Sequence, residues 1–185
     1  RTNMANCAIT DGYRQDTCPL PTPGAYQTLY IANLDDIVSW GSGTTAGEKD
    51  SITFAATKGL YKFQVQRDSV ILRDEKQEEE NGAINYTQEA TFKILDMSLT
   101  ARDAVDAMNG VDVVVIGRTK ADTFEICGYD NGARLAINVR STEAADLGHL
   151  ITIRAINQPG LMKHFYDGTS VASTITLLES YVVGS

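Results

Sequence analysis

Residues 111–139, with the sequence VDVVVIGRTKADTFEICGYDNGARLAINV, contain three short runs of strand-forming side chains separated by turn residues. The runs cover residues 113–116, residues 124–127 and residues 135–139. A glycine followed by a polar connector separates the first two runs, and the Asp-Asn-Gly turn at residues 130–132 separates the last two. Strands bounded by Gly, Asn and Asp at this spacing predict an antiparallel β domain.

Alternating segments on both sides extend this β pattern. Residues 26–34 predict a first strand. Residues 60–95 predict one long hairpin, because apolar and polar side chains alternate with a period of two in residues 61–65 and again in residues 84–94. Residues 149–156 alternate in the same way, and we expect them to close the series of strands.

The sequence predicts a single α-helix, which begins at Ser98 or Thr100 and ends at residues 109–110. Thr100 and Asp103 have the spacing of an N-cap residue and an acidic residue three positions on, and Asn-Gly is a natural stop. The modest apolar face of this helix consists of Leu99, Ala101, Val105 and Met108.

The composition favours one folded domain with extended arms, because the 185 residues are 43% hydrophobic and include only four prolines. We expect an N-terminal arm at residues 1–24, the main domain at residues 25–158, and a C-terminal arm or extra strand at residues 159–185. The predicted fold class is mainly β (α+β). It is an antiparallel β-sandwich or small barrel with one α-helix, a long β-hairpin and two extended arms.

The net charge is −8, from 24 acidic and 16 basic residues. A surface of this sign repels phosphate backbones, and no basic stripe offsets it, so we expect no specific nucleic-acid binding. The chain has no apolar window near ~18 residues and no leader pattern, so we expect neither a membrane protein nor a secretory precursor. The origin of residues 1–3, which precede Met4, is left open among upstream coding sequence, a processing remnant and an engineered addition.

The three cysteines are Cys7, Cys18 and Cys127, which cannot all pair within one chain. So few cysteines favour a cytoplasmic folding compartment. The ten residues between Cys7 and Cys18 do not match structural-zinc spacing. We therefore expect small buried thiols that anchor the N-terminal arm, and a Cys7–Cys18 disulfide formed after release from the cell stays open.

Catalytic groups are scarce. His149 and His164 are the only histidines, and we expect a sheet-edge residue and a loop residue rather than a catalytic pair. No nucleophile-elbow pattern supports a Ser-His-Asp arrangement. We therefore predict no catalytic residue, no cofactor-binding residue and no metal ligand, and we predict that the protein is not an enzyme.

Three further motifs have simple structural explanations. Residues 74–80 are strongly acidic but lack the alternating oxygen ligands and central glycine of a calcium-binding loop, so they predict a solvated hairpin tip. Residues 85–87 match the sequence of a glycosylation acceptor, but the motif means little because the sequence shows no leader pattern. Residues 128–132 lack the strand-to-helix context of a phosphate-binding loop and predict a hairpin turn.

Four stretches of the chain share the pattern of one protein family: MANCAITDGY at residues 4–13 with Cys18, followed by YIAN at residues 30–33; NGAINYTQE at residues 81–89; the helix followed by residues 113–116; and GYDNGARL at residues 128–135. Over residues 4–157 the chain resembles virion proteins of tailed bacteriophages, especially phages and prophages of Bacteroidetes hosts. It departs from the family at residues 141–148, which replace a small-residue and Gly-Asp segment, and at residues 161–185, which extend past the usual end.

The resemblance implies a tail-tube-like or neck/tail ring protein whose copies form rings around the DNA channel of a virion. Its partners would be further copies of itself and other tail or neck proteins, and DNA would pass through the lumen without specific binding. Synthesis would occur in the host cytoplasm. We expect the acidic residues 74–80 at a ring-to-ring contact or facing the channel, and the arms on neighbouring subunits. The resemblance leaves open the ring symmetry, the tail type, the host, and whether the subunits form a stacked tube or a single ring.

The alternative is a free-standing β-sandwich binding module of the adhesin or carbohydrate-binding type. Such a module exposes an aromatic platform. The single Trp40 and the dispersed tyrosines do not favour one.

Overall fold

The computed structural model describes residues 24–144 and 147–183, and most of its regular structure is strand. The strands of one sheet are β1 (Ala25–Asn33), β3 (Glu48–Lys49), β5 (Tyr61–Gln64), β8 (Val113–Thr119), β9 (Phe124–Cys127) and β12 (Lys163–Phe165). Those of a second sheet are β6 (Ile71–Glu78), β7 (Ile84–Ile94), β10 (Arg134–Ser141) and β11 (Gly148–Gln158). The spatial orders are β3-β12-β9-β8-β1-β5 and β10-β11-β7-β6, and the only parallel pair among them is β3 with β12. The predicted mainly β fold with antiparallel sheets is confirmed.

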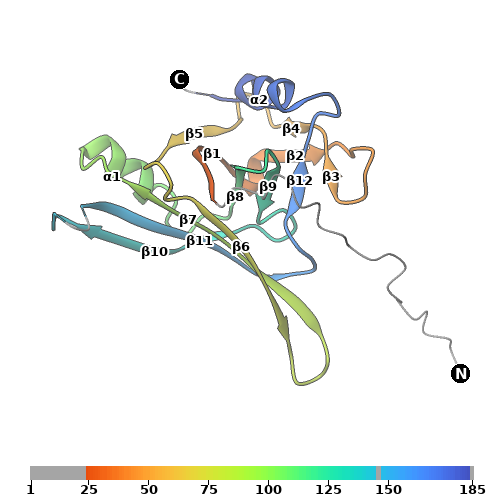
Figure 1. Ribbon diagram of the computed structural model, residues 1–185, viewed down its shortest axis with the longest axis horizontal. Coiled ribbons are helices and arrows are strands. Elements are labelled where there is room, and N and C mark those ends of the chain that lie inside the picture. Colours follow the sequence, from red (N-terminus) through yellow and green to blue (C-terminus); the bar gives the residue numbers. More distant parts are fainter. Residues whose placement is uncertain (1–23, 145–146, 184–185) are drawn as a thin grey trace, which may run out of the picture.

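The two sheets face each other, and a hydrophobic core fills the space between them (Figure 1). Alternate residues of β7 and β11 point into this core because successive side chains of a strand lie on opposite faces. Its large side chains include Leu29, Phe92, Val115, Ile151 and Ile153, each fully buried.

A second core lies on the other face of the six-stranded sheet. It is covered by η1 (Leu34–Asp36), the antiparallel pair β2 (Ile37–Trp40) and β4 (Ile52–Phe54), and the helix α2 (Val171–Ser180). Strand β8 is therefore buried on both faces, which explains why residues 113–116 are continuously apolar instead of alternating.

The predicted helix is confirmed as α1 (Leu99–Asp106), with Ser98 rather than Thr100 as its N-cap, but it ends at Asp106 and turns replace the predicted last residues 107–110. The hydroxyl of Ser98 accepts a hydrogen bond from the backbone N–H of Ala101 at 3.2 Å. Val105 and Met108 are buried as predicted, but Leu99 is 69% exposed, so the helix contacts the core mainly through its second half.

The predicted long hairpin is wrong in its pairing. Strand β5 pairs with β1 in the six-stranded sheet. The strand that forms a hairpin with β7 is β6, which contains most of the acidic residues predicted as a tip. The turn itself is confined to residues 79–83. Residues 61–65 and residues 71–78 both precede β7, and only long-range packing selects which of them pairs with it.

The Asp-Asn-Gly segment is not a hairpin turn, although the strands on either side of it are confirmed. It carries the chain from β9 in one sheet to β10 in the other. Gly128 and Gly132 have φ angles of +80° and +73°, and the N–H of Gly132 donates to the Gly128 carbonyl at 3.0 Å. A side chain at Gly128 would lie 2.8 Å from the backbone nitrogen of Ala133, so this crossing requires glycine there.

The C-terminal segment does not lie outside the sheets, and the prediction of a single helix is wrong. Residues 163–165 add β12 to the six-stranded sheet, and α2 packs on its outer face. Leu178 of α2 is fully buried, and Leu60 pairs with the segment after the helix through hydrogen bonds with Tyr181 (2.8 Å) and Val183 (3.0 Å). The predicted N-terminal arm, apart from Gly24, lies outside the described residues.

Candidate functional site

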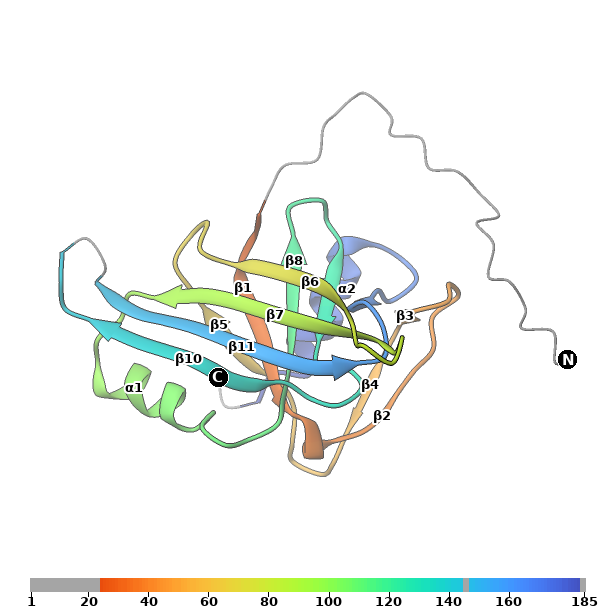
Figure 2. The same cartoon turned by 90° about the horizontal axis from the view of Figure 1, so that it is seen from below.

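The four-stranded sheet has one open face. Its inner face covers the core, and Figure 2 shows that no described element covers its outer face. In the described part of the chain, no strand pairs with the outer edge of β6 or with that of β10. Two rows of backbone N–H and C=O groups are therefore free to bind another strand.

The outer face mixes apolar and charged side chains. Exposed apolar residues on or beside it are Ile71 (57%), Ile137 (40%), Val139 (53%), Leu150 (43%) and Ile156 (60%). Arg154 and Glu89 form an ion pair of 2.5 Å at its centre, and their side chains are 40% and 22% exposed. Such a cluster of large apolar side chains is typical of a surface that contacts another macromolecule.

The two free edges carry different charges. Strand β6 and the following turn carry the five carboxylates predicted from the sequence, within residues 74–80. Strand β10 carries Arg134 and Arg140, which are exposed, and no acidic residue. Arg134 forms an ion pair of 2.6 Å with Asp112 and holds the pKa of that carboxyl below its usual range. The charge difference between the two edges can be seen in the sequence, because residues 134–141 are basic while residues 71–80 are acidic.

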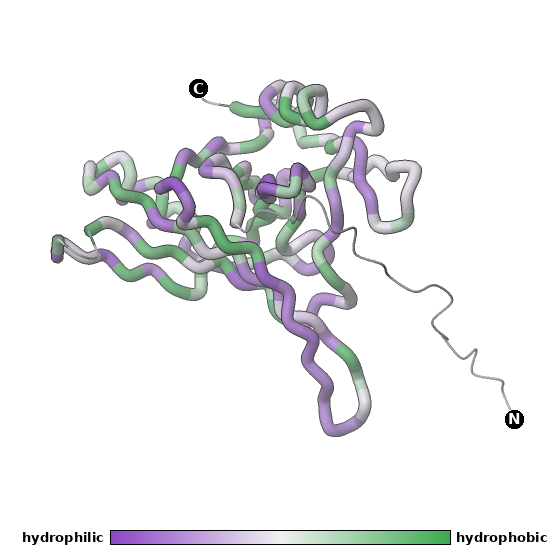
Figure 3. The backbone as a smooth tube through the Cα atoms, in the orientation of Figure 1, coloured by the Kyte–Doolittle hydropathy of each residue, from purple (hydrophilic) through white to green (hydrophobic). Residues whose placement is uncertain are grey.

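The β6–β7 hairpin projects beyond the body of the molecule, and its turn is hydrophilic (Figure 3). Gln88 fixes its base. The Gln88 amide oxygen accepts a hydrogen bond from the Gly128 N–H at 2.9 Å, and its amide nitrogen donates to the Gly160 carbonyl at 3.0 Å. The residue is only 1% exposed. Asp74 accepts from the Met162 N–H at 3.3 Å, and burial raises the pKa of its carboxyl. The hairpin is therefore held at a fixed angle to the sandwich.

The histidines lie elsewhere than predicted. His149 is not at a sheet edge: β11 is an inner strand, and the imidazole is 2% exposed with no hydrogen-bond partner among the described residues. His164 is not in a loop but in β12, where its register partners are Glu125 and Glu48. The two histidines therefore lie in different sheets, His149 on β11 and His164 on β12.

Glu125 is a partly buried carboxyl on β9. Burial raises its pKa, His164 lowers it and the Asp74 carboxylate raises it further. Within residues 24–144 and 147–183, no group of three His, Cys, Asp or Glu side chains is arranged to hold a metal ion. Cys127 is fully buried and its pKa is raised by burial, so it is not a reactive thiolate, and Cys7 and Cys18 lie outside the described residues.

We predict that Glu125→Gln stabilises the subunit at pH 8. A raised folded-state pKa means that the ionised carboxylate costs stability, which is regained as the pH falls through that raised pKa and is fully regained below the ordinary value of 4.5. Removing the charge should therefore raise the melting temperature at pH 8. The advantage over the unmodified chain should vanish at about pH 4. Thermal melts at both pH values check this, with the exposed Glu143→Gln as control. An equal gain at both pH values would contradict it.

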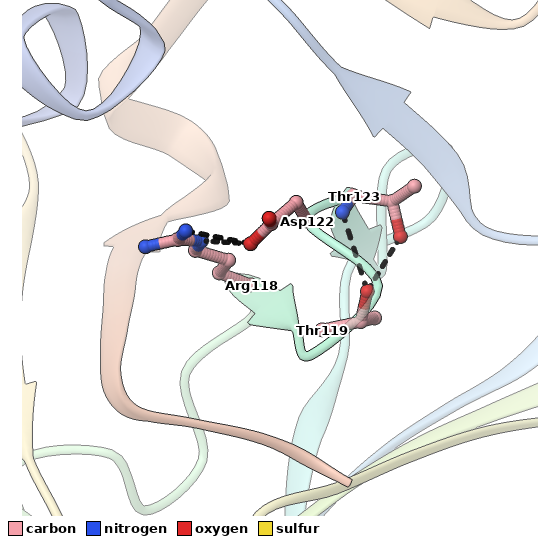
Figure 4. A network of polar contacts seen from close by, with 4 residues as sticks. All are labelled: Arg118, Thr119, Asp122 and Thr123. Atoms are coloured by element: carbon pink, nitrogen blue, oxygen red, sulfur yellow. Dashed lines mark hydrogen bonds and ion pairs between the residues drawn. The ribbon is translucent and has the colours of Figure 1, made fainter. Parts of the chain in front are cut away.

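A cleft of about 470 Å³ lies between β1, the β8–β9 turn and α2. Arg118 lies with its guanidinium carbon 4.1 Å from the centre of the Tyr26 ring, and Asp122 accepts from two of its nitrogens (Figure 4). Lys120 pairs with Asp68 at the rim. Because these two cations already have carboxylate partners, the cleft offers stacking and shape rather than a free charge.

The floor of the cleft is also an internal contact. The Tyr30 hydroxyl donates to Glu179 at 2.6 Å, and Lys62 lies 2.7 Å from the same carboxylate. These two groups, Lys62 first, lower the pKa of Glu179. The arrangement connects α2 to the sheet, and it contains no pair of nucleophile and base.

None of the helices in the described part of the chain is long and apolar enough to cross a bilayer. Comparisons of this chain with protein-family models, curated proteins and solved structures returned no match.

Proposed function

We infer that this chain is a structural protein of a bacteriophage virion, a tail-tube or neck/tail ring subunit that self-assembles into rings around the DNA conduit and has no catalytic centre. Two lines of argument support the proposal. The first is the resemblance of residues 4–157 to virion proteins of tailed phages. The second is the open four-stranded sheet, which suits a subunit that joins neighbours on two sides.

The observation that carries the proposal is the topology of that sheet. It contains four antiparallel strands with β6 and β10 at its edges. An even number of strands means that β6 and β10 run in opposite directions. A second copy placed head to tail would therefore continue the antiparallel order. Repeating this contact around an axis would close a barrel, which is how β proteins remove exposed edges.

The remaining features fit a conduit. The chain is acidic, so it does not bind the DNA backbone tightly. The projecting hairpin could contact an adjacent ring or another tail or neck protein. In this proposal the protein functions in the virion after synthesis in the host cytoplasm.

Solution mass provides the direct test. Light scattering of the purified chain, followed by negative-stain electron microscopy, should reveal rings or tubes of many copies. A ring subunit has a heterologous interface whose rotation closes. A chain that stays monomeric at high concentration and makes no lateral self-contact in a particle would overturn the proposal.

A free-standing β-sandwich binding module is the second candidate. The Arg118 cleft favours it, because Tyr26 is 40% exposed at its wall and aromatic faces bind sugars and other flat ligands. This candidate predicts a monomer or dimer that binds glycans. The same mass measurement therefore separates the two functions.

We predict that replacing Glu78, Glu79 and Glu80 together with glutamine changes assembly without changing the fold. All three side chains are exposed on the hairpin turn or next to it. Each surface substitution changes stability by about 0.5 kcal/mol or less, so the melting temperature of the triple variant should move by less than about 6 °C. The distribution of rings and tubes, and its dependence on salt, should shift because salt screens contacts between exposed charges.

The matched control for this variant removes three charges elsewhere, through Asp35→Asn, Asp103→Asn and Glu143→Gln, all at exposed positions. Mass distributions at low and high salt compare the two triple variants. If both shift assembly equally, the hairpin turn has no specific role and only net charge matters.

A further inference from the structure

We propose that the free edge of β6 in one copy pairs antiparallel with the free edge of β10 in the next copy, in the register that places Glu75 opposite Arg134 and Ile71 opposite Val139. The inference rests on the self-assembly proposed above and names the surface and register through which it occurs. The partner is a second copy of this chain.

Both edges are suited to strand addition. Each strand has eight residues, and the exposed residues are Ile71, Arg73 and residues 75–78 of β6, and all but two residues of β10. No proline interrupts either strand, so each can donate its outward N–H groups. Their opposite directions match the antiparallel pairing found between all neighbours of this sheet.

The face on which each side chain lies follows from the pairing within the subunit. On β6 the outer face carries Ile71, Arg73 and Glu75. Their register partners on β7 are Thr91, Glu89 and Thr87.

On β10 the outer face carries Val139, Ile137 and, beyond a bulge at residue 136, Arg134. Their register partners on β11 are Leu150, Thr152 and Arg154. A joint between two copies must keep these faces aligned, so only registers that differ by two residues are allowed.

Charge distinguishes the allowed registers. Register partners form rows across the sheet, and one row ends at Arg134 on β10 and at Arg73 on β6. If this row continued straight into the next copy, Arg73 would lie opposite Arg134. Like charges in directly opposed positions destabilise a strand pair. A shift of two residues replaces this contact with Glu75 opposite Arg134 and brings Ile71 opposite Val139. A shift of four leaves Arg134 opposite an uncharged residue. A closed barrel requires a shift of this kind, because its strands tilt and their register is staggered.

The shifted register also extends two ion pairs that already exist. Arg134 lies 2.6 Å from Asp112 and Arg73 lies 2.7 Å from Glu75, and all four side chains are at least 37% exposed. Placing Glu75 against Arg134 creates a row with alternating sign, Asp112, Arg134, Glu75 and Arg73. A network of this kind contributes more than isolated surface pairs do.

Charge reversal tests the pair. Glu75→Arg and Arg134→Glu should each raise the concentration needed for half-maximal assembly by about fivefold or more, because an attractive cross-strand pair becomes a repulsive one at every interface. The double variant Glu75→Arg/Arg134→Glu should lose less than the two single losses combined, because it restores an attractive pair between the copies although the pairs with Arg73 and Asp112 stay broken. Asp35→Arg, which also replaces a carboxylate with arginine but lies in η1, away from both edges, should have no such effect. Unchanged melting temperatures show that the subunits remain folded.

Cysteine cross-linking tests the register independently. In a background with Cys7→Ser and Cys18→Ser, the variant Ile71→Cys/Val139→Cys should form a ladder of disulfide-linked oligomers. Each of its single substitutions should not. Ile71→Cys/Ile137→Cys, which reports the straight register, should cross-link poorly, because a disulfide requires Cβ atoms within about 4.5 Å.

The outcomes separate this inference from the proposed function. If the unmodified chain forms rings but the cross-links favour the Ile137 variant, or neither variant, the register is wrong while the ring function stands. If the unmodified chain is monomeric, both proposals fail. If the two single losses simply add in the double charge reversal, the contact between Glu75 and Arg134 is refuted.

Discussion

Leu178→Asp should unfold the subunit. Leu178 lies on α2 and is 0% exposed in the core between this helix and the six-stranded sheet. A carboxylate at this position would be buried without a partner in an apolar environment. We expect a loss of about 4 kcal/mol or more, which is a large part of the stability of a typical domain.

The matched control is Thr176→Asp, two residues earlier on the same helix, where the side chain is exposed. It should change the melting temperature by less than about 2 °C, whereas Leu178→Asp should lower it by about 8–16 °C or abolish the transition. Circular dichroism melts of both variants measure the difference. Equal melts would mean that the helix is a dispensable arm.

Ile151→Ala should be the second large loss. Ile151 is 0% exposed on β11 and its side chain packs between the two sheets. Removing three buried carbons leaves a cavity that the surrounding residues fill only in part. The expected cost is about 2–5 kcal/mol.

The neighbouring residue provides the control. Leu150 is 43% exposed because adjacent side chains of a strand lie on opposite faces. Leu150→Ala should cost less than about 1 kcal/mol, although it removes the same number of carbon atoms. Chemical denaturation of both variants gives the two free energies of unfolding. If Leu150→Ala costs more than Ile151→Ala, the register of β11 is wrong by one residue.

These losses matter for assembly because α2 and the core of the sandwich hold the open sheet in place. The outer face and both edges of that sheet depend on a rigid support behind them. Variants at the edges, such as those at Glu75 and Arg134, are informative about assembly only while this support stays folded. Stability and assembly should therefore respond to different sets of substitutions.

Several elements of the fold were predictable from local sequence. The strands at residues 113–116, residues 124–127 and residues 149–156 were identified from periodicity and turn residues, which depend on near neighbours along the chain. The helix was identified from its capping sequence, and Ser98 is its N-cap. The acidic segment of the hairpin was also evident, since charge is a property of the sequence itself.

Helix α2 could not be predicted from local sequence. Its sequence, VASTITLLES, is rich in β-branched residues, which favour strands by intrinsic propensity. In the folded chain the helix is selected because it buries Leu178 and Thr174 against the sheet and is capped by Ser170. Burial of an apolar surface outweighs propensity differences of a few tenths of a kcal/mol per residue.

The sequence by itself therefore determined the β character of the chain, the positions of most strands, one helix and the sign of its charge. Only the tertiary structure decided that β5 joins β1, that the Asp-Asn-Gly segment crosses between sheets, that His149 is buried, and that β6 and β10 are free edges. Each of these depends on which distant strands pair. An edge strand and a central strand share the same alternation of side chains, and they differ only in the neighbour that folding places beside them.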